Sequence, residues 1–142
     1  MVTRQETMLM VAGGLHFALL IAASLVPGQL RWKCELAGLQ RMTRQLIWVH
    51  GFYVTLMIVG IGLLSLVFHA ELTSGSTLGR ALSGFIALFW CIRLGLGLFV
   101  FDTGPHLTRP WLIIGERMLT VLFAYFTTVY TWAAIAPEGS VR

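Results

Sequence analysis

The chain has very little charge for its length. Its 142 residues include ten basic and six acidic side chains, so charged residues make up 11% of the sequence while hydrophobic residues make up 57%. Soluble domains carry about twice that share of charge. The composition therefore excludes an ordinary soluble domain and indicates an integral membrane protein. A nucleic-acid partner is not expected, because no basic run alternates with aromatic residues.

Signatures of metal sites and of named reactions are also lacking. The two cysteines, Cys34 and Cys91, have no metal-binding or redox spacing, which argues against a zinc site and against a disulfide. The sequence contains no HExxH, no phosphate-binding glycine loop, no nucleophile elbow and no CxxC. We therefore expect no catalytic residues, no metal and no resident cofactor.

What the chain does have is four long apolar runs, at 8–26, 46–68, 81–101 and 111–135. Each is long enough to cross a hydrocarbon core of about 30 Å as a helix. Helical spacing of apolar residues extends the second run back to Leu36. The predicted fold class is all-α: one transmembrane four-helix bundle spanning residues 1–142, with antiparallel neighbours, short turns and no soluble domain. The predicted helices are 8–26, 36–69, 80–101 and 111–135.

Basic residues concentrate in the first and third connections between these helices. The positive-inside rule places both connections in the cytoplasm and both termini outside, in an inner or plasma membrane. The basic start of the second helix is expected to lie near anionic lipid headgroups, with a soluble partner as the alternative. The basic residues of the two connections are Arg31, Lys33, Arg41 and Arg44 in the first, and Arg109 and Arg117 around the third.

Small residues recur at every fourth position along two of the predicted helices. In lipid, such rows let two helix backbones approach closely and are typical of helix–helix interfaces. We predict that both rows form packing interfaces, with each other or with a neighbouring subunit. The longer row comprises Gly79, Ser83, Ala87, Cys91 and Gly95, and the shorter row comprises Gly14, Ala18 and Ala22.

Arg93 is the single charge within the apolar run 81–101. A guanidinium at that depth needs a partner and is a candidate functional group by default. Since neighbouring helices are antiparallel, Arg93 is expected about one turn above Glu116, and we predict that the two pair, with Asp102 as the competing partner. The pair would either fix helix register, which we favour, or contact a ligand or ion. The predicted inner-leaflet cluster comprises Arg93, Glu116, Asp102, His50 and Arg117.

Polar residues also continue along the last helix, and a histidine lies within the first. The stripe of polar residues either lines a path for water or protons, or its threonine hydroxyls bond to carbonyls of their own helix, which we favour. His16 could serve as an axial ligand of heme b only if the heme were shared across an oligomer, and a helix-contacting imidazole is preferred. The stripe comprises Glu116, Thr120, Thr127, Tyr130 and Thr131.

Two classes of function follow from these features. The first is a non-catalytic structural or accessory subunit, whose partners are the lipid bilayer and either other membrane proteins or copies of itself. The second is a membrane carrier or binding protein for an anionic or quinone-like ligand at Arg93, Glu116 and His50. Since no reaction motif is present, the sequence favours the first.

Overall fold

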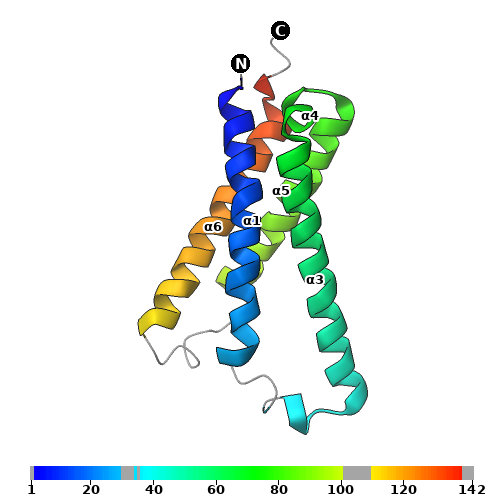
Figure 1. The fold of residues 1–142 in the computed structure, drawn as a ribbon, viewed down its shortest axis with the longest axis vertical. Helices are drawn as coiled ribbons and strands as arrows, with labels where there is room; N and C mark the ends of the chain where they lie inside the picture. The colour runs from blue at the N-terminus through cyan, green and yellow to red at the C-terminus, as the bar shows by residue number, and fades with distance from the viewer. Residues whose placement is uncertain (1, 30–33, 35, 101–109, 139–142) are drawn as a thin grey trace. The chain divides into compact units, whose positions relative to one another are not determined.

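The computed structural model describes residues 2–29, 34, 36–100 and 110–138 and is drawn in Figure 1. The described residues contain no β-strand. Four of the helices are long and apolar enough to cross a membrane, which confirms the predicted all-α class with four transmembrane helices. The elements are α1 (Arg4–Gln29), the 3-10 turn η1 (Leu36–Gly38), α3 (Arg41–Val67), α4 (His69–Thr73), α5 (Thr77–Phe99) and α6 (Pro110–Ile135).

The first helix begins at Arg4, four residues before the predicted start. A capping box explains the difference: the Thr3 amide donates to Glu6 Oε2 at 2.7 Å, and the Glu6 amide donates to Thr3 Oγ1 at 3.2 Å. These two bonds satisfy amides that a helix start otherwise leaves without partners. The sequence contains this Thr-x-x-Glu pattern, but the predicted helix start at residue 8 is based on the length of the apolar run alone.

The second predicted helix, 36–69, is three separate elements. Leu36–Gly38 forms a 3-10 turn, α3 begins only at Arg41, and it ends at Val67. Phe68 has φ −112° and ψ 26°, which interrupts the helix before α4 begins at His69. Gly38 is a weak helix former, so the early apolar spacing does not extend the helix through it. The predicted helix ends at residue 69, whereas α4 continues from His69 to Thr73.

The start of α5 is fixed by a serine cap. Ser76 Oγ accepts from the Gly79 amide at 3.0 Å and donates to Glu71 Oε1 at 2.6 Å, which links α5 to α4. Gly75 has φ 80°, a conformation that a residue with a side chain rarely adopts. The turn therefore requires glycine at 75 and a capping residue at 76.

The first two residues of the longer small-residue row, Gly79 and Ser83, contact α4. A Cβ on Gly79 would collide with the carbonyl oxygen of Glu71, and Ser83 Oγ donates to the carbonyl oxygen of Leu72 at 3.3 Å. Gly79, Ser83 and Ala87 are buried. Part of this row thus accommodates a short helix of the same chain, a partner that the four-residue spacing alone does not reveal.

The chain consists of two compact units. One comprises Met1–Met10 and Phe68–Arg142, and within it α5 and α6 are in extensive contact. The other is Val11–Val67, in which α1 and α3 approach closely: a Cβ on Gly62 would lie 3.0 Å from the Cβ of His16 and 3.4 Å from the carbonyl oxygen of Gly13. Glycine is needed at such an approach because it has no side chain.

Within the first unit, Gln5 at the start of α1 and Glu138 after the end of α6 cap each other's helix. Gln5 Nε2 donates to the carbonyl oxygen of Ala136 at 2.8 Å, and Gln5 Oε1 accepts from the Glu138 amide at 2.8 Å. In return, Glu138 Oε2 accepts from the Gln5 amide at 3.1 Å. One side chain therefore caps the end of α6, while the other caps the start of α1, and a carboxylate at a helix start also suits its dipole. The contact brings the start of α1 and the end of α6 together.

Replacing Gln5 by alanine is expected to lower the free energy of unfolding by about 1–3 kcal/mol, because the carbonyl of Ala136 and the amide of Glu138 lose two part-buried hydrogen bonds. Gln5 is 2% exposed, so water would not replace these bonds freely. The measurement is unfolding in detergent followed by circular dichroism. Gln45→Ala, at an exposed position of α3, is the control. Equal stability of the two variants would contradict the capping role.

Candidate functional site

Arg93 lies in α5 and is half-buried. Its Cζ atom sits 5.2 Å from the centroid of the Phe123 ring on α6. A cation over an aromatic face is attracted by the ring quadrupole, and the attraction grows where water is excluded. The charge that is isolated in the sequence is therefore placed against an aromatic partner on the neighbouring helix.

Trp90, one turn before Arg93, forms the centre of an aromatic cluster. Its ring stacks on Phe123 at a centroid distance of 5.2 Å and an interplanar angle of 23°, and it lies 4.8 Å from Phe126 at 46°. Trp90 is 1% exposed and Phe126 is fully buried. Residues three apart share a helix face, so Trp90 and Arg93 both reach α6 from the same side of α5. The cluster fixes the register of the two helices at this level.

The predicted partner of Arg93, Glu116, lies in the same helix as Phe123. Seven residues separate Glu116 from Phe123, which corresponds to about 10 Å along the helix axis. Glu116 is half-buried, whereas Arg117 is exposed. The pairing of Arg93 with Glu116 stays a prediction, and its structural setting is now defined by the contact between Arg93 and Phe123.

Two further members of the predicted cluster are not brought to Arg93 by the described contacts. Asp102, proposed as the competing partner, lies outside the described residues. His50 is an exposed residue of α3 and belongs to the unit Val11–Val67, whereas Arg93 and Glu116 belong to the other unit. The participation of both residues in one cluster therefore stays a prediction.

Two hydroxyls of the polar stripe on α6, those of Thr120 and Thr127, bond to their own helix, as favoured from the sequence. Thr120 Oγ1 donates to the carbonyl oxygen of Glu116 at 3.0 Å, and Thr127 Oγ1 donates to that of Phe123 at 2.8 Å. Such bonds use the hydroxyl hydrogen inside the helix. For these two threonines the interpretation as helix-bonded residues is confirmed.

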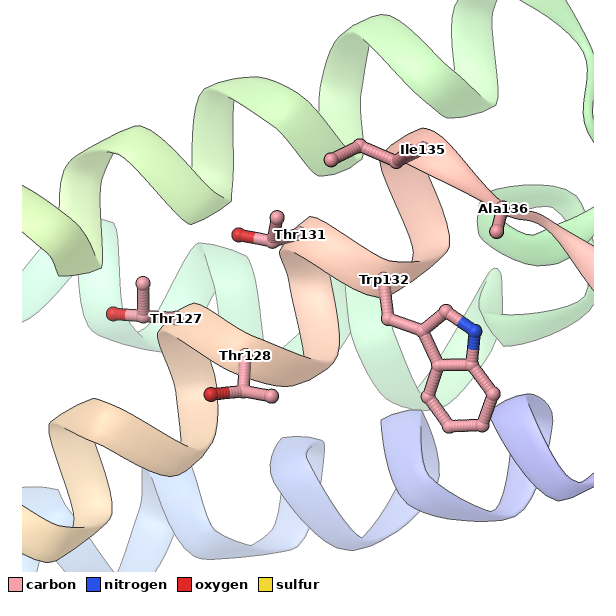
Figure 2. A pocket seen from close by; sticks show the side chains of 6 residues that line it. All are labelled: Thr127, Thr128, Thr131, Trp132, Ile135 and Ala136. Carbon is pink, nitrogen blue, oxygen red and sulfur yellow. The ribbon is translucent and has the colours of Figure 1, made fainter.

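A shallow pocket lies at the C-terminal end of α6 and is shown in Figure 2. Its surface is mostly apolar although three threonines contribute to it. Thr128 Oγ1 donates to the carbonyl oxygen of Ala124 at 2.8 Å, so this threonine also bonds within the helix. The lining residues are Thr127, Thr128, Thr131, Trp132, Ile135 and Ala136. The pocket offers little polar chemistry to a ligand.

His16 is fully buried, and its imidazole contacts its own helix. Its Nδ1 atom lies 2.6 Å from the carbonyl oxygen of Ala12, and since a carbonyl only accepts, Nδ1 carries the hydrogen of this bond. The predicted helix-contacting imidazole is therefore confirmed. A heme shared between two copies through His16 stays a prediction. Among the residues that the structure describes, no three His, Cys, Asp or Glu side chains are grouped so that they could hold a metal ion.

The remaining small residues of the two predicted rows are open. Gly14, Ala18 and Ala22 on α1 are exposed, and a Cβ on Gly14 would meet no atom within 4 Å. On α5, Cys91 is exposed, and a Cβ on Gly95 would likewise meet nothing within 4 Å. Gly13, one position away from the predicted row, is a residue of α1 that contacts α3, and a Cβ there would lie 2.7 Å from Leu66 Cγ.

The fold and these contacts define a small multi-pass membrane protein in which Thr120, Thr127 and His16 bond within their own helices. Comparison with protein-family models, with curated proteins and with solved structures gave no match to this chain.

Proposed function

We propose that this protein is a non-catalytic structural or accessory subunit that assembles in the membrane with copies of itself or with other membrane proteins. The observation that carries the proposal is the open row on α1, where Gly14, Ala18 and Ala22 are exposed at four-residue spacing. A glycine in a helix is less stable than alanine by about 1 kcal/mol, and contact with lipid does not compensate for this loss. Close packing against a partner helix compensates for it through van der Waals contacts between the two backbones.

The chemistry of the transmembrane helices supports the same proposal. Arg93 is placed against Phe123, and the hydroxyls of Thr120 and Thr127 bond within α6. Arg93 thus contacts the neighbouring helix, and the hydrogens of the two hydroxyls are used within their own helix. A role without catalysis is therefore the simplest function for this set of residues.

The experiment is purification in a mild detergent, followed by native mass measurement and identification of copurifying proteins. The expected particle exceeds the 15.8 kDa of one chain, because it contains further copies or other membrane subunits. A chain that remains a monomer without partners, both in mild detergent and in lipid nanodiscs, would contradict the proposal.

The second candidate function is a carrier or binding protein for an anionic or quinone-like ligand. It is favoured by one observation: Arg93 holds a permanent charge in a membrane-spanning helix and is only half-buried. Arg93→Met tests it, with Arg93→Lys as the variant that keeps the charge. If the Met variant assembles normally but loses binding of oleate or decylubiquinone by tenfold or more, the carrier function is supported. If assembly fails and the probes bind neither form, the subunit function is supported.

We also propose the orientation in which both termini lie outside and the connection after α1 lies in the cytoplasm. Cys34, an exposed cysteine in that connection, is a natural probe. A membrane-impermeant maleimide is expected to label Cys34 only after the cells are opened. Val2→Cys, at an exposed position near the start, is expected to react in intact cells. Labelling of Cys34 from outside would contradict this orientation.

A further inference from the structure

The first turns of α3 present arginine and aromatic side chains in one column. An α-helix turns by 100° per residue, so Arg41, Arg44, Trp48 and Phe52 fall within about 80° of the helix surface. All four are exposed, with Trp48 at 46% and Phe52 at 66%. The buried residues of α3 begin only at Ile58. This part of the helix is thus open to its surroundings on the side of the column.

The length of α3 places the arginine end of the column at the membrane surface. Its 27 residues span about 40 Å, and a tilt of about 20° reduces this to about 38 Å across the membrane. The hydrocarbon core is only about 30 Å thick, so one end of the helix must extend beyond it. The end that carries Arg41 and Arg44 is the one that extends, because charged side chains are costly in hydrocarbon and the other end is apolar.

The order of side chains along the column matches the order of groups in a phospholipid. Arginines come first, Trp48 follows one turn after Arg44, and Phe52 follows one turn after Trp48, each step rising about 6 Å. Guanidinium groups bind phosphate oxygens, tryptophan prefers the level of the glycerol esters, and phenylalanine suits the acyl chains. The stretch Arg41–Val67 contains no acidic residue that would repel a phosphate.

We propose that this column is a binding site for an anionic phospholipid of the surrounding membrane. Arg41 and Arg44 hold the headgroup phosphate, Trp48 contacts the glycerol region, and Phe52 lies along an acyl chain. The occupant is a lipid rather than an acidic soluble protein, because the column continues from the charged surface directly into the apolar span. The site is independent of the subunit function, since none of its residues belongs to the small-residue rows.

The test is quenching of tryptophan fluorescence by brominated lipids in vesicles of the full-length protein. Brominated phosphatidylglycerol is compared with brominated phosphatidylcholine at equal mole fraction, and the contribution of Trp48 is the difference between the protein and Trp48→Phe. That contribution is expected to show preference for phosphatidylglycerol. Since each basic side chain near an anionic surface contributes about 1 kcal/mol, the preference should fall by about fivefold per arginine replaced by glutamine. Added salt should reduce it as well.

Two variants make the outcome specific to the column. Arg41→Lys/Arg44→Lys keeps the charge and is expected to keep most of the preference. Arg4→Gln/Arg80→Gln removes the same charge elsewhere and is expected to leave it unchanged. Equal quenching by the two lipids in the parent protein would overturn the proposal. So would a preference that survives Arg41→Gln/Arg44→Gln in a protein with an unchanged helical spectrum, or one that the control variant loses equally.

Discussion

Trp90→Ala is expected to lower the free energy of unfolding by about 3–5 kcal/mol. Trp90 is 1% exposed, and its ring contacts both Phe123 and Phe126 between α5 and α6. Removing the indole leaves a cavity at the centre of the helix pair and abolishes the two aromatic contacts with α6, each of which adds about 0.5–1.5 kcal/mol beyond its buried area. Unfolding with increasing sodium dodecyl sulfate, followed by circular dichroism, measures the change.

Trp111→Ala is the matched control for that experiment. Trp111 also lies in α6, but it is 47% exposed, so its loss creates no internal cavity. Its expected effect is below about 1 kcal/mol. If Trp90→Ala unfolds no more easily than Trp111→Ala, the aromatic cluster does not hold α5 and α6 together.

Gly13→Leu is the second large effect, with an expected loss of about 1–3 kcal/mol from forced separation of α1 and α3. A Cβ at Gly13 would lie 2.7 Å from Leu66 Cγ and 3.1 Å from the carbonyl oxygen of Gly62. The second contact is with backbone, which cannot rotate away. Thermal unfolding in detergent measures the loss, and the distance between spin labels at Val11 and Leu63 should increase.

Gly14→Leu controls for the intrinsic effect of leucine in this helix. Leucine is a better helix former than glycine, and this gain is the same at both positions. Because a Cβ on Gly14 meets no atom within 4 Å, the fold is expected to remain as stable as that of the parent or to become slightly more stable. Similar destabilisation by both variants would show that Gly13 is not a special contact of α1 with α3.

The helices were predictable from the sequence because membrane spans depend mainly on the length of an apolar run. Their ends were less predictable, since caps and single residues decide them. Thr3 and Glu6 start α1 at Arg4, and the conformation of Phe68 separates α3 from α4. Apolar content carries no information about such hydrogen bonds. The reciprocal caps of Gln5 and Glu138 depend on the meeting of distant segments, which one sequence does not reveal.

The candidate site was predictable only in part. The position of Arg93 within an apolar run identified it as a residue that needs a partner, and the favoured behaviour of Thr120 and Thr127 followed from the chemistry of hydroxyls in helices. The sequence does not indicate the contact of Arg93 with Phe123, because a phenylalanine in an apolar helix cannot be distinguished from its apolar neighbours by pattern alone. Pattern alone also does not identify Gly13. Gly13 and Gly14 are adjacent and lie on different faces of α1, and only the packed structure shows that Gly13 is the one that contacts α3.

Sedimentation equilibrium of Gly14→Leu beside the parent protein in a mild detergent tests the proposed subunit function most directly. The parent is expected to sediment as a complex, while Gly14→Leu is expected to sediment at the 15.8 kDa of one chain with an unchanged helical spectrum. Such a result would separate assembly from folding, since the substitution touches the open row and no internal contact. The proposed subunit function is contradicted if Gly14→Leu and the parent sediment with the same mass.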